Sequence, residues 1–357
     1  MIQNTSRPRQ TAPAFALSGS PFDIGVQHGR AVGRQLRDFL ADRCARIETL
    51  LGRAIDRHRV YGELSLHAAV IEEDLPEIAE EIRGLATGAD VSYMDALLLQ
   101  MRREIIGKVR SNGECTTFAA GADHGATIVA QNVDLNADLA DLGYVLSVRP
   151  LSPNEPPYII YTFGGLIGFA GLNAAQLAIG INYVESGGWR SGASPYLIVR
   201  HLLKFENIEQ CIAELRRIRR SSSRCLVIAD RTRAVAIELT VDDLRILEAP
   251  LIFHTNHYLH PELVARDCMN VFSRNASAQR LRRIRQLMSD WTHEWPTHKV
   301  FAALSDHSLS PMGLCAHSDD IRREDTAASI VLRPAQGRLY ARKGHPCNGI
   351  TQSYEFI

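Results

Sequence analysis

The chain has 357 residues, of which 45% are apolar and 22% charged, as is typical of a soluble globular protein with a large core. Its 40 basic and 40 acidic residues give a formal net charge of zero, so charge does not indicate binding to nucleic acid or an anionic membrane. We find neither an apolar run long enough to span a membrane nor a signal peptide. The seven cysteines are scattered without CxxC pairs, which argues against disulfides and a cysteine zinc site. We therefore expect a cytoplasmic protein without a metal or other cofactor.

The first third of the chain is predicted to be helical. Residues 1–14 form a polar arm, and apolar residues then recur at helical spacing from Pro21 to about Lys108. A second helix is expected from about Leu64 to Leu85, and Ser92 is placed to cap a third.

After Gly113 the apolar period becomes that of β-strands. The predicted strands are Thr116–Ala119, Thr127–Asp134, Tyr144–Val148, Tyr158–Phe163, Gln176–Tyr183, Leu226–Asp230, Val235–Thr240, Leu251–His254, Ala328–Arg333 and Gly337–Arg342. Helices are predicted at Pro195–Phe205, Ile208–Arg219 and Ser277–Leu287. Helices first and many strands afterwards indicate a layered α+β fold.

A glycine-rich segment, residues 164–171, resembles a phosphate-binding loop at first sight. It has no following Lys-Ser/Thr and no Gly-x-Gly-x-x-Gly order, so we reject a nucleotide site. We expect these glycines to let the backbone pass close to another segment or a ligand.

Cys115 lies where the pattern changes from helix to strand, in Asn112-Gly113-Glu114-Cys115-Thr116-Thr117. We interpret this junction as a peptide bond that the protein cuts itself, between Glu114 and Cys115. The new N-terminal cysteine would then carry both a nucleophilic thiol and an α-amine, whose reference pKa of about 7.7–8.0 suits a general base.

Such a nucleophile needs supporting groups. Asn256 follows a predicted strand in His254-Thr255-Asn256-His257 and is our candidate oxyanion donor. Asp134, at the end of Gln131-Asn132-Val133-Asp134, is expected to position the amine or to assist the cut. The side chains of Thr116 and Thr117 are expected to bond the backbone around the nucleophile.

Other interpretations of these residues compete. A single cysteine is most often a buried structural residue, and Asn132 and Asp134 are common turn formers. The spacing of His254, His257 and His260 resembles a metal site, but Pro261 disfavours a helix there. The chain has no Gly-x-Ser-x-Gly elbow, which disfavours a serine hydrolase.

Taken together, the motifs resemble the penicillin acyltransferase-like family of cysteine N-terminal-nucleophile hydrolases, which includes isopenicillin-N acyltransferase. The resemblance extends over nearly the whole chain. Its motifs are residues 19–29, Cys115-Thr116-Thr117, Gln131-Asn132-Val133-Asp134, Gly171-Leu172-Asn173, Gly180-Ile181-Asn182-Tyr183, His254-Thr255-Asn256-His257 and Ala327-Ala328-Ser329-Ile330-Val331.

The resemblance implies a four-layer αββα fold and a precursor (a zymogen) that undergoes autoproteolysis. The products would be a helical chain, residues 1–114, and a chain carrying the nucleophile, residues 115–357, associated as one compact unit. Carried over, Asp134 assists the cut and Asn256 lines the oxyanion hole. Three positions depart from the family pattern. Glu114 replaces a glycine, Val133 replaces an aromatic residue, and Ala316 replaces an arginine whose role could pass to His317, Arg322 or Arg323.

We therefore expect an amidohydrolase or acyltransferase that acts through an acyl-enzyme on a small N-acylated compound or an acyl-CoA donor. Two alternatives remain open. One is an unprocessed relative that acts as a binding or scaffold protein. The other is a cysteine hydrolase that does not self-cleave and uses His254 or His257 as its base.

Overall fold

The structure, a computed structural model, describes residues 10–107, 114–136, 139–289, 295–318, 320 and 322–356. Most of the predicted N-terminal arm, residues 1–9, and residues 112–113 of the cysteine motif therefore lie outside the described residues. The helices are α1 (Pro21–Ala41), α2 (Ile47–Leu51), α3 (Arg57–Asp74), α4 (Pro76–Ala89), α5 (Tyr93–Ile106), α6 (Pro195–Leu202), α7 (Ile208–Arg217), α8 (Pro261–Val264), α9 (Val271–Leu287) and α10 (Thr297–Leu304). Among the described helices, none combines the length and the apolar character needed to span a membrane.

The strands form two sheets. Their bounds are β1 (Ala14–Gly19), β2 (Glu114–Ala120), β3 (Ile128–Asn136), β4 (Gly143–Pro150), β5 (Tyr158–Phe163), β6 (Ala170–Asn173), β7 (Ala178–Asn182), β8 (Arg224–Ala229), β9 (Ala234–Leu239), β10 (Leu244–Glu248), β11 (Leu251–His254), β12 (Glu324–Arg333), β13 (Arg338–Lys343) and β14 (Gln352–Glu355). The eight-stranded sheet has the order β1-β4-β5-β6-β7-β8-β9-β10, and the six-stranded sheet has the order β11-β2-β3-β12-β13-β14.

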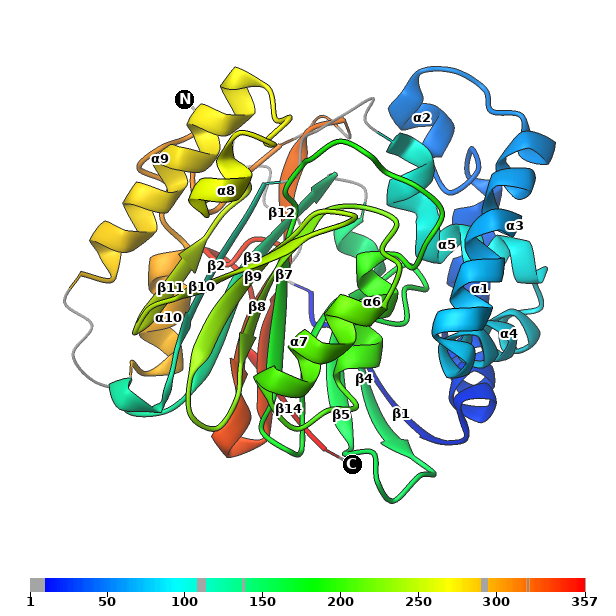
Figure 1. Cartoon of the computed structure of the whole chain (residues 1–357), viewed down its shortest axis with the longest axis horizontal. Helices are drawn as coiled ribbons and strands as arrows, with labels where there is room; N and C mark the ends of the chain where they lie inside the picture. The colour runs from blue at the N-terminus through cyan, green and yellow to red at the C-terminus, as the bar shows by residue number, and fades with distance from the viewer. Residues whose placement is uncertain are drawn as a thin grey trace.

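The two sheets pack face to face between helices (Figure 1). Hydrogen bonds join the two sheets across the interface between them, for example from Nε2 of Gln131 in β3 to the carbonyl oxygen of Ile181 in β7. Helices α9 and α10 contact the six-stranded sheet. On the other side α1 contacts β4, and Arg200 of α6 stacks on Tyr158 of β5. These layers confirm the α+β, αββα expectation.

The N-terminal helices are tied to the eight-stranded sheet by β1, which pairs in parallel with β4. Ser20 begins α1 with a capping box, because its side chain accepts from the Asp23 amide and the Asp23 side chain accepts from the Ser20 amide. Pro21 follows as the first helical residue, where its missing N–H has no cost. The chain therefore turns sharply from strand into helix.

Local signals predicted some boundaries and missed others. Tyr158–Phe163 and Leu251–His254 are strands with the predicted bounds, and Ser92 caps α5 by accepting from the Asp95 amide. The single helix expected over residues 64–85 is wrong, because Pro76 cannot continue a helix and the segment divides into α3 and α4. The chain also forms elements that we did not predict, namely α8, α10, β1, β6, β10 and β14.

The glycine-rich segment is used for close backbone approach. Gly164 and Gly165 have φ of 50° and 86°, a region that favours glycine. A Cβ on Gly168 would lie 2.4 Å from the carbonyl oxygen of Tyr196 at the start of α6. The packing of α6 against the sheet therefore depends on this segment.

Helices α1 and α4 cross through glycine contacts, and we expect Gly25→Ala to destabilise the protein. A Cβ on Gly25 would lie 2.1 Å from the backbone oxygen of Glu81, so the two helices must separate. We expect the free energy of unfolding to fall by about 1–3 kcal/mol in denaturant titrations. Gly62→Ala is the control, because Gly62 is exposed in α3 and an added methyl group there would meet no other atom within 4 Å. That variant should gain about 0.5–1 kcal/mol, and equal effects of the two changes would contradict the argument.

His28 of α1 is buried against β4, and its titration should make the fold acid-sensitive. Its Nε2 lies 2.7 Å from the Tyr144 hydroxyl, and burial lowers the pKa of His28 to about 3. An unfolded histidine has a pKa of about 6.5, so the unfolded chain binds the proton first as pH falls. The stability that the neutral imidazole contributes is therefore complete above about pH 6.5 and is lost progressively towards about pH 3.

The test compares denaturant unfolding of the parent and His28→Gln at about pH 7.5 and about pH 5. The parent should lose about 2 kcal/mol more than the variant between the two conditions, since one pKa unit corresponds to about 1.4 kcal/mol. His58→Gln, a change at an exposed histidine of α3, should keep the parent's pH dependence. An unchanged pH dependence in His28→Gln would contradict this account.

Candidate active site

Cys115 is the second residue of β2, which lies between β11 and β3 in the six-stranded sheet. Side chains alternate along a strand, so Cys115 shares a face with Thr117. The Thr117 hydroxyl donates to Oδ1 of Asn182 in β7, at 2.5 Å, so this face is turned towards the other sheet. The Cys115 thiol is therefore buried between the two sheets, with 4% of the residue exposed.

Two asparagines hold the backbone of Cys115. Its N–H donates to Oδ1 of Asn256 at 2.8 Å, and its carbonyl oxygen accepts from Nδ2 of Asn182 at 3.4 Å. Asn256 follows β11, and β11 pairs with β2 in a register that sets His254 opposite Thr117. This pairing brings Asn256 to Cys115 across 141 residues of sequence.

Asn256 is itself fixed on both ends of its amide. Its Oδ1 also accepts from Nη2 of Arg280 at 2.7 Å, and its Nδ2 donates to the carbonyl oxygen of Tyr183 at 3.0 Å. Its backbone N–H donates to the hydroxyl of Ser277 at 2.7 Å. The amide oxygen is therefore held in place to accept from the nitrogen atom of Cys115.

The thiol is neutral in the intact chain. Burial, together with the negative charge of Asp134, raises the pKa of Cys115 to about 12. The Sγ atom lies 3.9 Å from the backbone oxygen of Asp134 and donates to it. A thiol in this state needs a base before it can act as a nucleophile.

Asp134 lies beside the predicted cleavage site. In the register of β2 and β3, Glu114 pairs with Asp134 and Cys115 pairs with Val133. The Asp134 side chain is buried, and its Oδ1 accepts from the Thr326 hydroxyl at 2.6 Å. That hydroxyl in turn accepts from the backbone N–H of Ala316 at 2.9 Å. The structure therefore brings Asp134 opposite Glu114 and Asn256 to the Cys115 N–H, so both lie beside the peptide bond between residues 114 and 115.

Among the other predicted residues, Thr117 bonds Asn182, whereas Thr116 lies buried on the opposite face of β2. Asn132 has a structural role, because its Nδ2 donates to the carbonyl oxygens of Leu304 and Leu314. It holds the loop after α10 against β3.

His254 and His257, the two histidines considered as bases for the thiol, contact groups other than Cys115. His254 Nε2 lies 2.8 Å from Oε1 of Glu238, and its Nδ1 lies 2.8 Å from the backbone oxygen of Thr255. Burial alone would lower the pKa of His254, but Cys225 and the Glu238 carboxylate raise it well above its ordinary value. His257 Nδ1 lies 2.7 Å from the Ser277 hydroxyl, and burial lowers the pKa of His257 to about 4.

Arg280 is one of the site residues that the sequence analysis missed, with Asn182 and Arg224. Arg280 is fully buried and donates to Asn256. Arg322 had been considered as a replacement for the arginine absent at position 316, but it pairs with Asp320 at the surface. The sequence feature that could have identified Arg280 is its position in α9, where it lies on the buried face of the helix with Ser277, Leu281 and Ile284. An arginine on the apolar face of a helix indicates a buried partner.

A pocket opens beside the thiol at the junction of α5 with the two sheets. Its apolar lining includes Leu99, Leu135, Phe163, Leu166, Phe169 and Ile181, and Cys115 lies on its wall. Polar groups also line it: Arg103 stacks on the Tyr183 ring, and Arg224 lies over the rings of Tyr183 and Tyr196. The pocket thus combines apolar walls with positive charge.

The chain was compared with known proteins. The family model described as acyl-coenzyme A:6-aminopenicillanic acid acyl-transferase matches residues 121–348, a range that includes Asp134 and Asn256 and begins after Cys115. The acyl-coenzyme A:6-aminopenicillanic-acid-acyltransferase 40 kDa form of Emericella nidulans is 24% identical over 339 residues, 92% of each chain. The beta-alanyl-dopamine/carcinine hydrolase of Drosophila melanogaster is 24% identical over 228 residues, 58% of each chain.

Among the solved structures that resemble part of the chain are a penicillin V acylase and a conjugated bile acid hydrolase. Penicillin V acylase from Agrobacterium tumefaciens has a TM-score of 0.47 at 12% identity, covering 68% of this chain and 86% of that chain. A mutant of conjugated bile acid hydrolase from Clostridium perfringens has a TM-score of 0.45 at 11% identity, covering 68% of this chain and 97% of that chain.

Proposed function

Because the chain belongs to the acyl-coenzyme A:6-aminopenicillanic acid acyltransferase family, a family of acyltransferases and amidohydrolases that act on C–N bonds, we propose that it is a self-cleaving enzyme with Cys115 as its N-terminal nucleophile. Its substrate is a small N-acylated compound, and its reaction is hydrolysis or transfer of the acyl group. The two products of the cut, residues 1–114 and 115–357, stay together as one enzyme.

The contact between the Cys115 N–H and Asn256 Oδ1 supports this proposal most strongly. In the cut enzyme the same nitrogen is the α-amine, and Oδ1 of Asn256 accepts a hydrogen bond from it. The amine is thereby held next to its own thiol, as a combined base and nucleophile requires. Oxyanion donation by Asn256 would use the second N–H of Nδ2, because the first donates to the Tyr183 carbonyl oxygen.

Self-cleavage begins when the Cys115 thiol attacks the carbonyl carbon of Glu114 and loses its proton. The bond between that carbon and the Cys115 nitrogen then breaks, the nitrogen takes up a proton, and a thioester joins Glu114 to Sγ. Water hydrolyses the thioester, leaving a carboxylic acid on Glu114 and a free thiol and amine on Cys115. The register of β2 and β3 supports a role for Asp134 here, since it lies opposite Glu114.

In turnover the α-amine takes the thiol proton while Sγ attacks the substrate carbonyl carbon. The C–N bond breaks, the leaving amine receives the proton, and the acyl group remains on Sγ as a thioester. Water completes a hydrolysis, and a second amine completes a transfer. The apolar pocket walls beside Sγ suit a small hydrophobic acyl group.

Arg224 extends the proposal to the charge of the substrate. The residue is 2% exposed and lines the pocket, and its Nη1 donates to the backbone oxygen of Ser223 at 2.7 Å. Its Nη2 lies 4.0 Å from Oε1 of Glu104 and is without a hydrogen-bond partner among the described residues. A buried guanidinium with a donor left over suits a carboxylate on the substrate.

We therefore expect Arg224→Gln to raise KM for carboxylate-bearing N-acyl substrates by roughly 10–100-fold, the loss of one charge-assisted hydrogen bond of about 1.5–3 kcal/mol. Neutral amides of the same size should be affected much less. Arg216→Gln, at an exposed arginine of α7, is the matched control and should leave both values unchanged. Equal losses for charged and neutral substrates would remove Arg224 from substrate recognition.

The acyl-enzyme provides the test of the proposed function. Purified enzyme is mixed with a panel of N-acyl amides, N-acyl amino acids and acyl-CoA donors, quenched in acid and measured by intact mass. We expect an acyl group on the fragment that begins at Cys115, and the released amine distinguishes hydrolysis from transfer when a second amine is added. An acyl group on another residue would contradict the proposal. An uncut chain with a highly reactive Cys115 would instead support the histidine-assisted alternative.

A further inference from the structure

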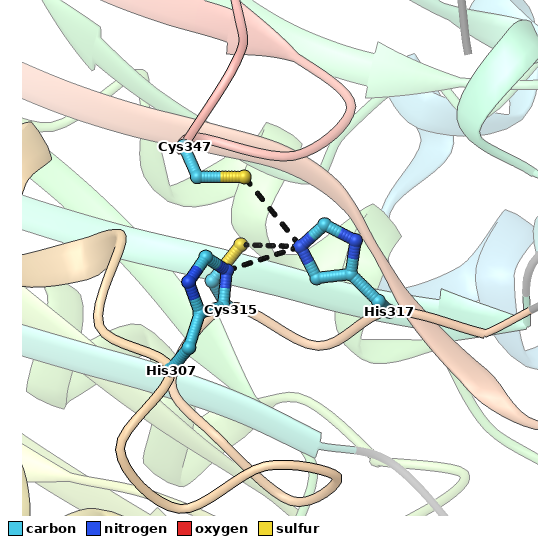
Figure 2. A group of neighbouring side chains, drawn as sticks. All are labelled: His307, Cys315, His317 and Cys347. Carbon is cyan, nitrogen blue, oxygen red and sulfur yellow. Dashed lines mark hydrogen bonds between the residues drawn. The ribbon is translucent and has the colours of Figure 1, made fainter. Parts of the chain in front are cut away.

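A second group of chemically reactive side chains lies away from the Cys115 thiol. It consists of His307, Cys315, His317 and Cys347, called here the Cys/His cluster, and its four ligand atoms lie within 4.8 Å of one another. Figure 2 shows the four side chains pointing towards one space. Three of them come from the loop between α10 and β12, and Cys347 comes from the loop between β13 and β14. Cys315 is buried, and the other three are exposed.

The contacts around His317 cannot all be hydrogen bonds. Its Nε2 lies 3.1 Å from Nε2 of His307, 3.4 Å from Sγ of Cys315 and 3.5 Å from Sγ of Cys347 (Figure 2). A neutral imidazole nitrogen offers either one proton or one lone pair, so it serves one such partner. Three partners around one nitrogen are instead the arrangement of ligands that surround a common centre.

The three distances from His317 Nε2 are close to the edges of a coordination tetrahedron. Zinc binds thiolate sulfur at about 2.3 Å and imidazole nitrogen at about 2.0–2.1 Å, which at tetrahedral angles gives N–S edges of about 3.6 Å and an N–N edge of about 3.3 Å. The corresponding distances at His317 are 3.4 and 3.5 Å to the two sulfurs and 3.1 Å to the nitrogen. These three edges are therefore within a few tenths of an ångström of the tetrahedral values, and all four ligand atoms lie within 4.8 Å of one another.

We propose that the Cys/His cluster is a structural zinc site with two thiolate and two imidazole ligands. Four protein ligands close the coordination sphere, so the ion has no open position for catalysis. On binding, each thiol releases its proton to solvent and coordinates as a thiolate, while both histidines coordinate as neutral imidazoles.

A bound zinc ion would link the loop between α10 and β12 to the loop between β13 and β14, and the first of these loops contacts residues near Asp134. Leu304 ends α10 and Leu314 lies in the loop after it, and the carbonyl oxygens of both accept from Asn132 of β3. The same loop presents the Ala316 N–H to Thr326, the residue that donates to Asp134. A metal ion joining this loop to Cys347 therefore stabilises the surroundings of Asp134 without touching the reaction.

Zinc content and cobalt spectroscopy test the site directly. Protein purified without chelators should contain about one zinc ion per chain by elemental analysis. After zinc is removed, added Co²⁺ should give the intense sulfur-to-cobalt charge-transfer absorption of thiolate ligands. The Cys115→Ala variant should behave identically, which separates this site from the active-site thiol and makes the result independent of enzymatic activity.

Variants at the exposed ligands locate the ion. Cys347→Ser and His307→Ala should weaken zinc binding on the order of 100-fold or more, and zinc should no longer raise their melting temperature. Cys268→Ser and His58→Ala change an exposed cysteine and an exposed histidine outside the cluster, so they should bind zinc like the parent. Circular dichroism of each metal-free variant shows whether it is folded before the titration.

Three results would overturn the proposal. The parent protein could bind neither zinc nor cobalt when fully reduced. The control variants could lose the metal as readily as the ligand variants. The freshly purified protein could contain a disulfide between Cys315 and Cys347, detected as a cross-linked peptide that reductant separates, which would make the pair a covalent link instead of two metal ligands.

Discussion

Cys115→Ala is expected to give an intact, folded and inactive chain. The variant keeps the bond between residues 114 and 115, because the sulfur that attacks the Glu114 carbonyl is missing. It also lacks the nucleophile for the substrate, so kcat should fall on the order of 10⁴-fold or more. Intact mass under denaturing conditions and an acyl-transfer assay measure the two effects, and circular dichroism establishes that the chain is folded.

Cys268→Ala is the control for this experiment, because Cys268 is an exposed free cysteine whose thiol donates to the backbone oxygen of Arg266, outside the site described above. It should be cut and active like the parent. A Cys115→Ala chain that is nevertheless cut after residue 114 would mean that another protease does the cutting. Retained activity would mean that another group is the nucleophile.

Asn256→Ala is expected to lower turnover by roughly 10²–10³-fold in the cut enzyme, the cost of removing a main polar contact at the reacting centre. The change removes the oxygen that accepts from the Cys115 nitrogen and from Arg280. It should also move the acidic limb of the pH–rate profile to lower pH. An acceptor oxygen favours the charged ammonium form, so its loss lowers the pKa of the α-amine.

The pH–rate profile distinguishes a role of Asn256 in positioning the Cys115 amine from an effect of the substitution on protein stability alone. Asn173→Ala removes another buried asparagine, one that donates to the backbone oxygens of Leu203 and Phe205 in the segment after α6. That variant should lose stability and keep its pH profile and its turnover per folded molecule. A normal rate and profile in Asn256→Ala would remove Asn256 from the catalytic site.

The sequence predicted elements better than it predicted their neighbours. Short apolar runs predicted β5 and β11 with correct bounds, because Pro157 and Gly164 flank β5 and Pro250 precedes β11. No local pattern indicates that β11 pairs with β2, since that contact is non-local. Asn256 was assigned to the Cys115 site from its place after a predicted strand and from the family resemblance, and neither predicted its contact with the Cys115 nitrogen.

The features that the sequence analysis missed also depend on contacts between segments far apart in the sequence. The strand β1 is a short apolar alternation next to a polar arm, and its partner β4 lies more than a hundred residues away. Arg280 reaches Asn256 only because α9 packs on the sheet beside β11. In the Cys/His cluster three ligands come from one loop and the fourth from another, so no CxxC spacing marks them.

The intact mass of freshly purified protein under denaturing conditions tests the central claim most directly. The account predicts two species, of 114 residues and, from 357 − 114, of 243 residues, the longer one beginning with Cys115 on N-terminal sequencing. A single species of 39.6 kDa that stays uncut during prolonged incubation would contradict it.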